Sequence, residues 1–316
     1  MFMLQPPSPA AGCLEHGMQS LIIGNNTFHW GSRTYVMGIL NVTPDSFSGD
    51  GLMSNGDLLE QSLRQAGHFL RHHADILDVG GESTRPGSQP VTVDEELERV
   101  IPVIQAINKN FPDAIISIDT YKARVAEEAF KAGAHILNDV WALRADPDLA
   151  SIAKAFNAPV ILMHNRSNPA SVEVRAQLGN AYIGSEYQNL IEDVKRELLA
   201  SVELAKRAGI EAGRIVLDPG IGFGKTREHN LELINRLGEI RSLGYPLLLG
   251  PSRKSFIGFT LDLPADQRVE GTAATIAIGI ARGAVIIRVH DVKEMSRVAK
   301  MTDAIVRDTE RRIEVG

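Results

Sequence analysis

Three polar residues, Asp119, Asn138 and Asp218, stand at the ends of short apolar runs. The two carboxylates accept hydrogen bonds, whereas the amide both accepts and donates. Together they suit the amino and ring N–H edge of a flat heterocycle. A site that matches buried polar groups in this way rejects analogues that lack them.

A second set of polar residues carries positive charge. Arg253, Lys254, Arg288 and His290 also follow apolar runs, and such side chains suit phosphate oxygens. Asn41 ends the first long run and offers a neutral oxygen. It could complete a largely hydrated Mg²⁺ sphere that is shared with a diphosphate.

Each of these residues also has an ordinary structural interpretation. Asp119 could cap the helix that follows it, and Asn138 could do the same for the next helix. Asp218 could belong to a turn, and Lys254 could be a solvated surface lysine. Burial of charge at the end of a strand is costly unless the charge is paired or used. The position that they share therefore favours a binding site over separate structural roles.

The elements that must place these side chains alternate along the chain. Nearly continuous apolar runs of this length indicate strands that are buried on both faces, as in a parallel sheet. Stretches with helical periodicity lie between them, for example after Thr92 and after Gln188, and several end at a glycine such as Gly133, Gly209 or Gly244. The runs are Tyr35–Asn41, Ala74–Gly81, Ala114–Thr120, His135–Val140, Pro159–His164, Arg214–Gly220, Pro246–Ser252 and Ala284–Asp291.

Eight strands that alternate with helices fit either a closed barrel or an open doubly wound sheet. The first run lacks the GxGxxG sequence of a dinucleotide-binding sheet, and eight units in about 280 residues favour the barrel. We therefore predict an α/β fold, a (β/α)8 TIM barrel. A short β-hairpin with its turn at Gly24-Asn25-Asn26 should precede it. Barrel chemistry is placed at the carboxyl ends of the strands.

Composition limits the remaining choices. The chain has 316 residues, a net charge of -6 and one cysteine, Cys13, which excludes an internal disulfide and argues against nucleic-acid or anionic membrane partners. No apolar run is long enough to span a bilayer, and the start of the chain does not resemble a secretory signal, so we expect a soluble cytoplasmic protein. Residues 1–18 are expected to form a flexible tail, and residues 19–316 a single domain.

One apparent phosphate loop is rejected. Gly220 to Thr226 resembles the end of a GxxxxGK[ST] loop, but Pro219 stands where the pattern requires its first glycine. We interpret these glycines as residues that let the backbone approach a ligand, with Phe223 packed against it.

Eight motifs, in this order, resemble dihydropteroate synthase, and the resemblance runs from about residue 20 to the C-terminus. Short pieces such as SIDT are weakly specific, whereas NVTPDSF, ESTRPG, DPGIGFGK and SRKSF in sequence are highly specific. The motifs are MGILNVTPDSFS (37–48), LDVGGESTRPG (77–87), SIDTYK (117–122), LNDV (137–140), LMH (162–164), LDPGIGFGK (217–225), SRKSF (252–256) and RVHD (288–291).

The resemblance implies a homodimeric, Mg²⁺-dependent transferase of folate biosynthesis and a sulfonamide target. Such an enzyme joins 6-hydroxymethyl-7,8-dihydropterin diphosphate to 4-aminobenzoate and releases diphosphate. The matching positions imply that Asp119, Asn138, Asp218 and Lys254 hold the pterin, that Thr84, Arg288 and His290 hold the diphosphate with Asn41 on the metal, that Phe47, Pro86, Phe223 and Ser255 line the aminobenzoate pocket, and that Arg85 and Met163 also contact substrate.

The expected mechanism is dissociative, because an aryl amine is a weak nucleophile and no strong base stands out. Asp119, Lys254, Arg288 and His290 are the predicted catalytic residues. Two alternatives remain open: a methyltransferase that uses methyltetrahydrofolate on the same pterin-binding fold, and a barrel that binds pterin without turnover. Neither needs the diphosphate-binding cations.

Overall fold

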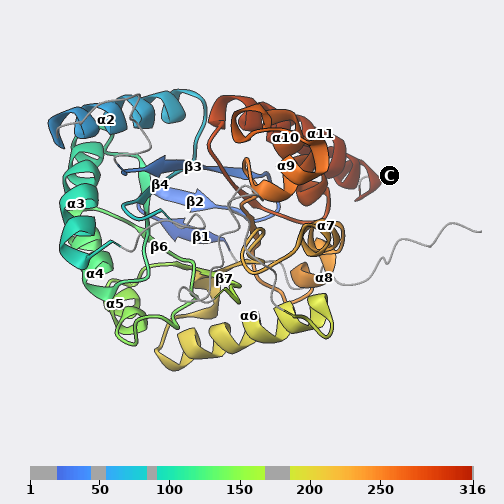
Figure 1. Cartoon of the computed structure of the whole chain (residues 1–316), viewed down its shortest axis with the longest axis horizontal. Helices are drawn as coiled ribbons and strands as arrows, with labels where there is room; N and C mark the ends of the chain where they lie inside the picture. Colours follow the sequence, from blue (N-terminus) through green and yellow to red (C-terminus); the bar gives the residue numbers. More distant parts are fainter. Residues whose placement is uncertain (1–19, 44–54, 84–90, 168–185, 315–316) are drawn as a thin grey trace, which may run out of the picture.

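Eight parallel strands form the centre of the computed structural model, which describes residues 20–43, 55–83, 91–167 and 186–314. Their order around the sheet is β8-β7-β6-β5-β4-β3-β10-β9, and a parallel bridge between Leu217 and Leu247 joins β8 to β9, so the sheet closes into a barrel (Figure 1). The strands are β3 (Tyr35–Asn41), β4 (Ile76–Gly80), β5 (Ile115–Asp119), β6 (Ile136–Asp139), β7 (Val160–Met163), β8 (Ile215–Asp218), β9 (Leu248–Leu249) and β10 (Ile286–Val289).

Helices follow each strand and surround the barrel (Figure 1). The (β/α)8 prediction is confirmed. The helices are α2 (Asn55–Arg71), α3 (Val93–Asn110), α4 (Ala123–Ala132), α5 (Leu149–Ala155), α6 (Leu190–Arg207), α7 (Arg227–Asn235), α8 (Leu237–Arg241), α9 (Ser255–Leu261), α10 (Val269–Ala281) and α11 (Val292–Glu314), with 3-10 turns at Ala212–Arg214 and Ala265–Gln267. Within the described part of the chain, no helix has both the length and the apolar character that a membrane span requires.

Local sequence explains where the helices begin and end. The Thr92 side chain accepts a hydrogen bond from the Glu95 N–H, and the Glu95 carboxylate accepts one from the Thr92 N–H. Together they form a capping box at the start of α3. Gly133 ends α4 with φ of 115°, a conformation that glycine adopts readily. Strand β9 is shorter than the predicted run because Gly250 and Pro251 end it, and proline has no N–H for the ladder.

The predicted hairpin is confirmed and covers one end of the barrel. Strands β1 (Leu21–Ile23) and β2 (Asn26–Phe28) are antiparallel, and Gly24 turns between them with φ of 56°. One apolar cluster joins buried side chains of the hairpin to residues near the start of every barrel strand. Its members are Leu21, Ile23, Phe28, Tyr35, Met37, Ile76, Ile115, Ile136, Ile161, Val216, Leu248, Val285 and Ile286.

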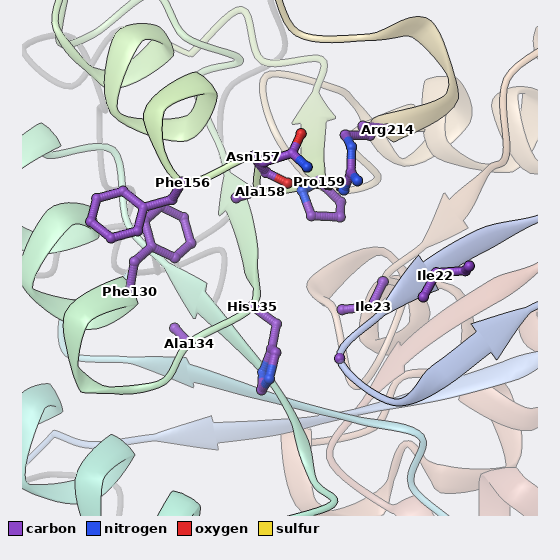
Figure 2. Close-up of a pocket in the computed structure, with 11 residues that line it drawn as sticks. Ile22, Ile23, Phe130, Ala134, His135, Phe156, Asn157, Ala158, Pro159 and Arg214 are labelled. Atoms are coloured by element: carbon purple, nitrogen blue, oxygen red, sulfur yellow. Dashed lines mark hydrogen bonds between the residues drawn. The ribbon is translucent and has the colours of Figure 1, made fainter.

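A hollow of about 270 Å³ lies at this amino-terminal end, beside the hairpin (Figure 2). His135, Pro159 and Arg214 directly precede β6, β7 and β8 and line it. The Arg214 guanidinium donates to the Asn157 carbonyl (2.9 Å), and His135 Nδ1 accepts from the Ile116 N–H (3.2 Å). Both side chains thus bond the backbone of the fold, and the predicted site residues lie elsewhere.

Candidate active site

The predicted polar residues gather at the carboxyl ends of the strands. Asp119 and Asp218 end β5 and β8, Asn138 lies one residue before the end of β6, Arg288 lies one residue before the end of β10, and His290 follows β10 directly. Asp119 is paired with Asn138 in the sheet register. The sequence-based expectation that they share one rim is therefore confirmed.

Arg288 connects two carboxylates that come from different strands. Its Nε donates to Asp78 Oδ2 (2.5 Å), and its guanidinium also donates to Asp119 Oδ2. Asn138 Nδ2 donates to the same Asp78 oxygen (3.2 Å). Asp119 is not the cap of α4, because that helix begins at Ala123, whose N–H donates to Asp146. These hydrogen bonds link side chains of four strands: the Arg288 cation contacts both carboxylates, and the Asn138 amide contacts Asp78.

Burial shifts the pKa values of several of these groups, and two of them lie close to neutral pH. It raises the pKa of Asp119 to about 7, with Asp78 adding to the effect and Arg288 opposing it. It also raises the pKa of Asp218 and lowers that of Lys254 to about 7, while the two opposite charges moderate each other. Strong shifts of this kind in one cluster are typical of functional sites.

An apolar wall adjoins this polar edge. The Lys254 ammonium lies 4.3 Å from the Phe223 ring centroid and donates to the Ile221 carbonyl, so the solvated-lysine interpretation is wrong. Phe223 packs with buried Val140 and Met163, and with the partly buried Tyr121 and Trp141. A planar ligand could place its face on this wall and its polar edge against the carboxylates.

The glycines of the loop after β8 permit this close packing. The Gly220 N–H donates to Asp218 Oδ1 (2.7 Å), so Asp218 both closes a turn and faces the site. A Cβ at Gly222 would lie 2.7 Å from Lys254 Cδ, in a backbone with φ of 84°. The prediction that these glycines bring the backbone close to the site agrees with this geometry.

Cations at the rim differ in their pairing. Arg253 Nε donates to Asp291 Oδ2 (2.8 Å), so this arginine ties the loop after β9 to the loop after β10 rather than presenting a free charge. His290 Nδ1 lies 3.0 Å from Ser252 Oγ. Ser255, the first residue of α9, stands next to Lys254.

The remaining predicted residues are divided between described and undescribed parts of the chain. Asn41 ends β3, where it is half-buried and paired with Gly80 in the sheet register. Phe47, Thr84, Arg85 and Pro86 lie outside the described residues. Their contributions to the site stay predictions.

The donor set decides what metal the site could hold. Across the described ranges, no group of three or more His, Cys, Asp or Glu side chains is placed to hold a metal ion. Asn41 offers one amide oxygen, a hard neutral donor. A weakly held Mg²⁺ that takes most of its ligands from water and a bound diphosphate fits this set.

Sequence reasoning missed two residues of the site. Asp78, which is fully buried, was hidden in the middle of an apolar run, although a charge inside a buried strand was itself a signal. Lys225, which is 3% exposed, lies beneath the loop that carries Phe223. Only its place after the glycines distinguished it from a surface lysine.

Comparisons with known proteins agree with this geometry. The family model described as pterin binding enzyme matches residues 37–290. A dihydropteroate synthase of Clostridium beijerinckii is 50% identical over 286 residues, which cover 90% of this chain and 99% of the relative.

Two solved structures extend the likeness to the fold. The Clostridium difficile dihydropteroate synthase, solved in the presence of pteroic acid, has a TM-score of 0.80 and 48% identity and covers 89% of this chain and 99% of its own. The Xanthomonas albilineans enzyme with 4-aminobenzoic acid has a TM-score of 0.80 and 36% identity, with 90% and 97% covered. This chain belongs to the dihydropteroate synthase family of pterin-binding enzymes.

Proposed function

We propose that this chain condenses 6-hydroxymethyl-7,8-dihydropterin diphosphate with 4-aminobenzoate to give 7,8-dihydropteroate and diphosphate, a step of folate biosynthesis. The observation that carries the proposal is the cluster at one rim of the barrel, in which Arg288 joins Asp78 and Asp119 beside Asn138. Membership of the family and the ligands named for its solved members support the same substrates.

The pterin takes the polar edge. Asp119, Asn138 and Asp218 accept its amino and ring N–H groups, and Asn138 also donates. Met163 offers apolar surface to the flat ring, and Lys254 would donate to it. Because Asn138 and Asp218 are buried and the Asp119 side chain is 11% exposed, a ligand that lacked the matching N–H edge would leave them poorly paired and bind weakly.

The diphosphate takes the cationic side. Arg288 lies on β10 and His290 follows it directly, and both would stabilise the charge that grows as the C–O bond to the leaving group breaks. Asn41 would contribute one oxygen to a Mg²⁺ ion, which supplies charge neutralisation on the diphosphate. Thr84 and Arg85 are proposed to add to this side, and Phe47, Pro86, Phe223 and Ser255 to the amine pocket.

In the proposed path, the bond to the leaving group breaks before the bond to the amine forms. The carbon–oxygen bond to diphosphate breaks first, and the electron-rich dihydropterin carries the positive charge on its exocyclic methylene. Ionised Asp119 stabilises that cation electrostatically. The amine of 4-aminobenzoate then forms the C–N bond, and the resulting acidic ammonium gives one proton to water or to the released diphosphate, so that no strong base is needed.

A diphosphate-release assay tests the function. We expect release from the pterin diphosphate only when 4-aminobenzoate is present. Lys254→Ala and Asp119→Ala should each reduce kcat/KM by about 100-fold or more, since removing a group that stabilises developing charge costs about 3 kcal/mol. Arg64→Ala, which removes an exposed cation of α2, is the control and should leave turnover unchanged.

The alternatives give different results in the same assay. Lack of release with a folded protein would favour a barrel that binds pterin without turnover. A methyltransferase that uses methyltetrahydrofolate would bind a pterin without diphosphate, so His290→Ala would leave its ligand affinity nearly unchanged. The cations at this rim, which such an enzyme does not need, disfavour that alternative.

We also propose that the protein acts as a homodimer through α10 and its neighbours. Helix α10 is largely apolar, with Glu270 as its single charged residue. It nevertheless exposes half of the Ile278 side chain to solvent. Helices α9 and α11 flank it (Figure 1) and expose Phe259, Leu261, Met301 and Ile305. Exposed apolar side chains on three neighbouring helices are typical of a protein interface.

Light scattering tests the dimer. Ile278→Glu should convert a dimer of the purified protein to a monomer, because it places a charge at the centre of the apolar face. Leu199→Glu, which changes another exposed apolar residue, on α6, is the matched control and should leave the mass unchanged. A mass that is the same for Ile278→Glu and the unmodified protein would contradict the proposed interface.

A further inference from the structure

A buried lysine lies under the loop that carries Phe223. The Lys225 ammonium meets three acceptors: the Gly220 carbonyl at 2.9 Å, the Phe223 carbonyl at 3.1 Å and His164 Nδ1 at 3.0 Å. Burial lowers the pKa of Lys225 to about 7, and in its protonated form the side chain has three N–H donors, one for each acceptor. Two of the three acceptors are backbone atoms of one loop, and Lys225 therefore ties its beginning to its end.

The third acceptor is itself held in place. His164 Nε2 lies 3.0 Å from Glu197 Oε2 on α6, and Arg166 pairs with the same carboxylate. Burial and the nearby Lys225 lower the pKa of His164 to about 4, so the ring is neutral at pH 7. A neutral ring that donates from Nε2 to Glu197 must accept at Nδ1, where Lys225 donates.

Other contacts hold the same loop from outside. The Gly222 N–H donates to Asn230 Oδ1 (2.6 Å), and the Tyr187 hydroxyl donates to the Gly224 carbonyl (3.2 Å). Neither contact reaches the Phe223 carbonyl, which Lys225 holds. The Phe223 N–H donates to the Gly220 carbonyl (3.1 Å), the other oxygen that Lys225 holds. Asp218, in contrast, lies on β8 and is fixed by its register with Met163. Loss of Lys225 should thus move Phe223 and leave Asp218 in place.

We propose that Lys225 is a positioning residue for the second substrate: through the Gly220 and Phe223 carbonyls it fixes the Phe223 ring at the site and so sets the affinity for the aryl amine. The inference rests on the proposed function for the identity of that amine. It assigns Lys225 no contact with substrate. Its effect passes through the backbone of the loop after β8, while the polar edge that holds the pterin stays with the strands.

Steady-state kinetics of Lys225→Met test this role. The substitution keeps the length of the side chain and removes all three donors. We expect KM for 4-aminobenzoate to rise about tenfold or more, while KM for the pterin diphosphate changes by less than about threefold. Equal changes in both KM values, or no change in either with a folded variant, would overturn the proposal.

A double-mutant cycle shows whether Lys225 acts through Phe223. Phe223→Ala should raise KM for the amine, and adding Lys225→Met to it should cause little further rise, because the two residues act on one contact. Additive effects would overturn the proposed route. If Lys225→Met does not fold, His164 offers a milder pair: His164→Leu removes the third acceptor and should show the same split, whereas His164→Asn can keep an acceptor near Nδ1 and should lie closer to the unmodified protein.

A readout that needs no turnover separates the two proposals. Trp141 packs against the cluster of Val140, Met163 and Phe223. In a Trp30→Phe background, Lys225→Met should shift the Trp141 fluorescence to longer wavelength as Phe223 moves away. That shift in a protein that releases no diphosphate would reject the proposed function and keep the positioning role. A spectrum that is unchanged by Lys225→Met would reject the positioning role.

Discussion

At the scale of single residues, the site concentrates groups that burial would otherwise disfavour. Asp78 and Asp119 share one guanidinium, and Lys254 rests on a carbonyl and an aromatic face instead of water. Taking each charge from water costs free energy, and the pairings return only part of it. The substrate-free protein is therefore less stable than the same barrel with apolar residues at these positions would be.

Asp119→Asn tests that cost. The folded-state pKa of Asp119, about 7, is above its unfolded value of 3.8, so ionisation favours the unfolded chain and this carboxyl lowers stability as pH rises from about 4 to 7. An amide has no such titration. Relative to the unmodified protein, the variant should gain stability by about 1–3 kcal/mol between pH 5 and pH 8, while its turnover falls.

Thermal melts at the two pH values measure the difference. The expected sign is a melting temperature that rises for Asp119→Asn, relative to the unmodified protein, as pH goes from 5 to 8. A difference that stays constant or reverses would show that the Arg288 pairing, and not burial, governs the ionisation of Asp119. Asp94→Asn, which changes an exposed acid on α3, is the control for the substitution itself.

At the scale of elements, the loop after β8 shows how glycine lets a backbone pack tightly. Gly220 has φ of 71°, and a Cβ there would lie 1.8 Å from the His164 carbonyl oxygen. The neighbouring chain is backbone and cannot move aside as a side chain would. The loop can therefore take only one residue type at this position.

Gly220→Ala should accordingly destabilise the protein by about 3 kcal/mol or more, because backbone strain and overlap act together. Gly238→Ala is the matched control: the nearest atom to its Cβ lies 3.8 Å away, within helix α8, where alanine is preferred. Urea unfolding should show a lower midpoint for the first variant and an equal or higher one for the second. Equal midpoints would contradict the overlap.

Sequence predicted most of the elements and the rim because both signals are local. An apolar run followed by Asp119 or Asp218 is visible without knowledge of contacts. Asp78 was missed because its partner Arg288 lies 210 residues away, and a continuous run gives no alternation to mark it as inward. Lys225 was overlooked, and the pairing of Arg253 was not predicted, because sequence cannot tell which acceptor a cation will meet, whether His164 or Asp291.

At the scale of the whole molecule, stability and chemistry are placed at opposite ends of the barrel. The hairpin packs Phe28 against the starts of the strands, whereas the polar site lies at their carboxyl ends. Phe28 is 2% exposed and contacts the rings of Trp30 and Tyr35. Substitutions at the hairpin should thus change the stability of the fold without changing catalysis.

Phe28→Ala should lower the free energy of unfolding by about 3–5 kcal/mol, the usual cost of emptying a buried aromatic site. Both KM values and kcat, measured well below the melting temperature, should stay within about twofold of the unmodified protein. Calorimetry measures the loss of stability, and the release assay measures the kinetic constants. A large change in either KM would mean that the two ends of the barrel are coupled. Ile22→Ala, an exposed neighbour on the same hairpin, should change neither.

The barrel is joined least firmly beside Asp218. Strand β9 contributes only Leu248 and Leu249, and β8 meets this segment at a single bridge, Leu217 to Leu247. Few backbone hydrogen bonds must break to part the ring there, so amide protons of residues 247–249 should exchange with solvent sooner than those of β4 or β5. Local opening of the native sheet would then begin next to Asp218, and a bound substrate would slow this opening.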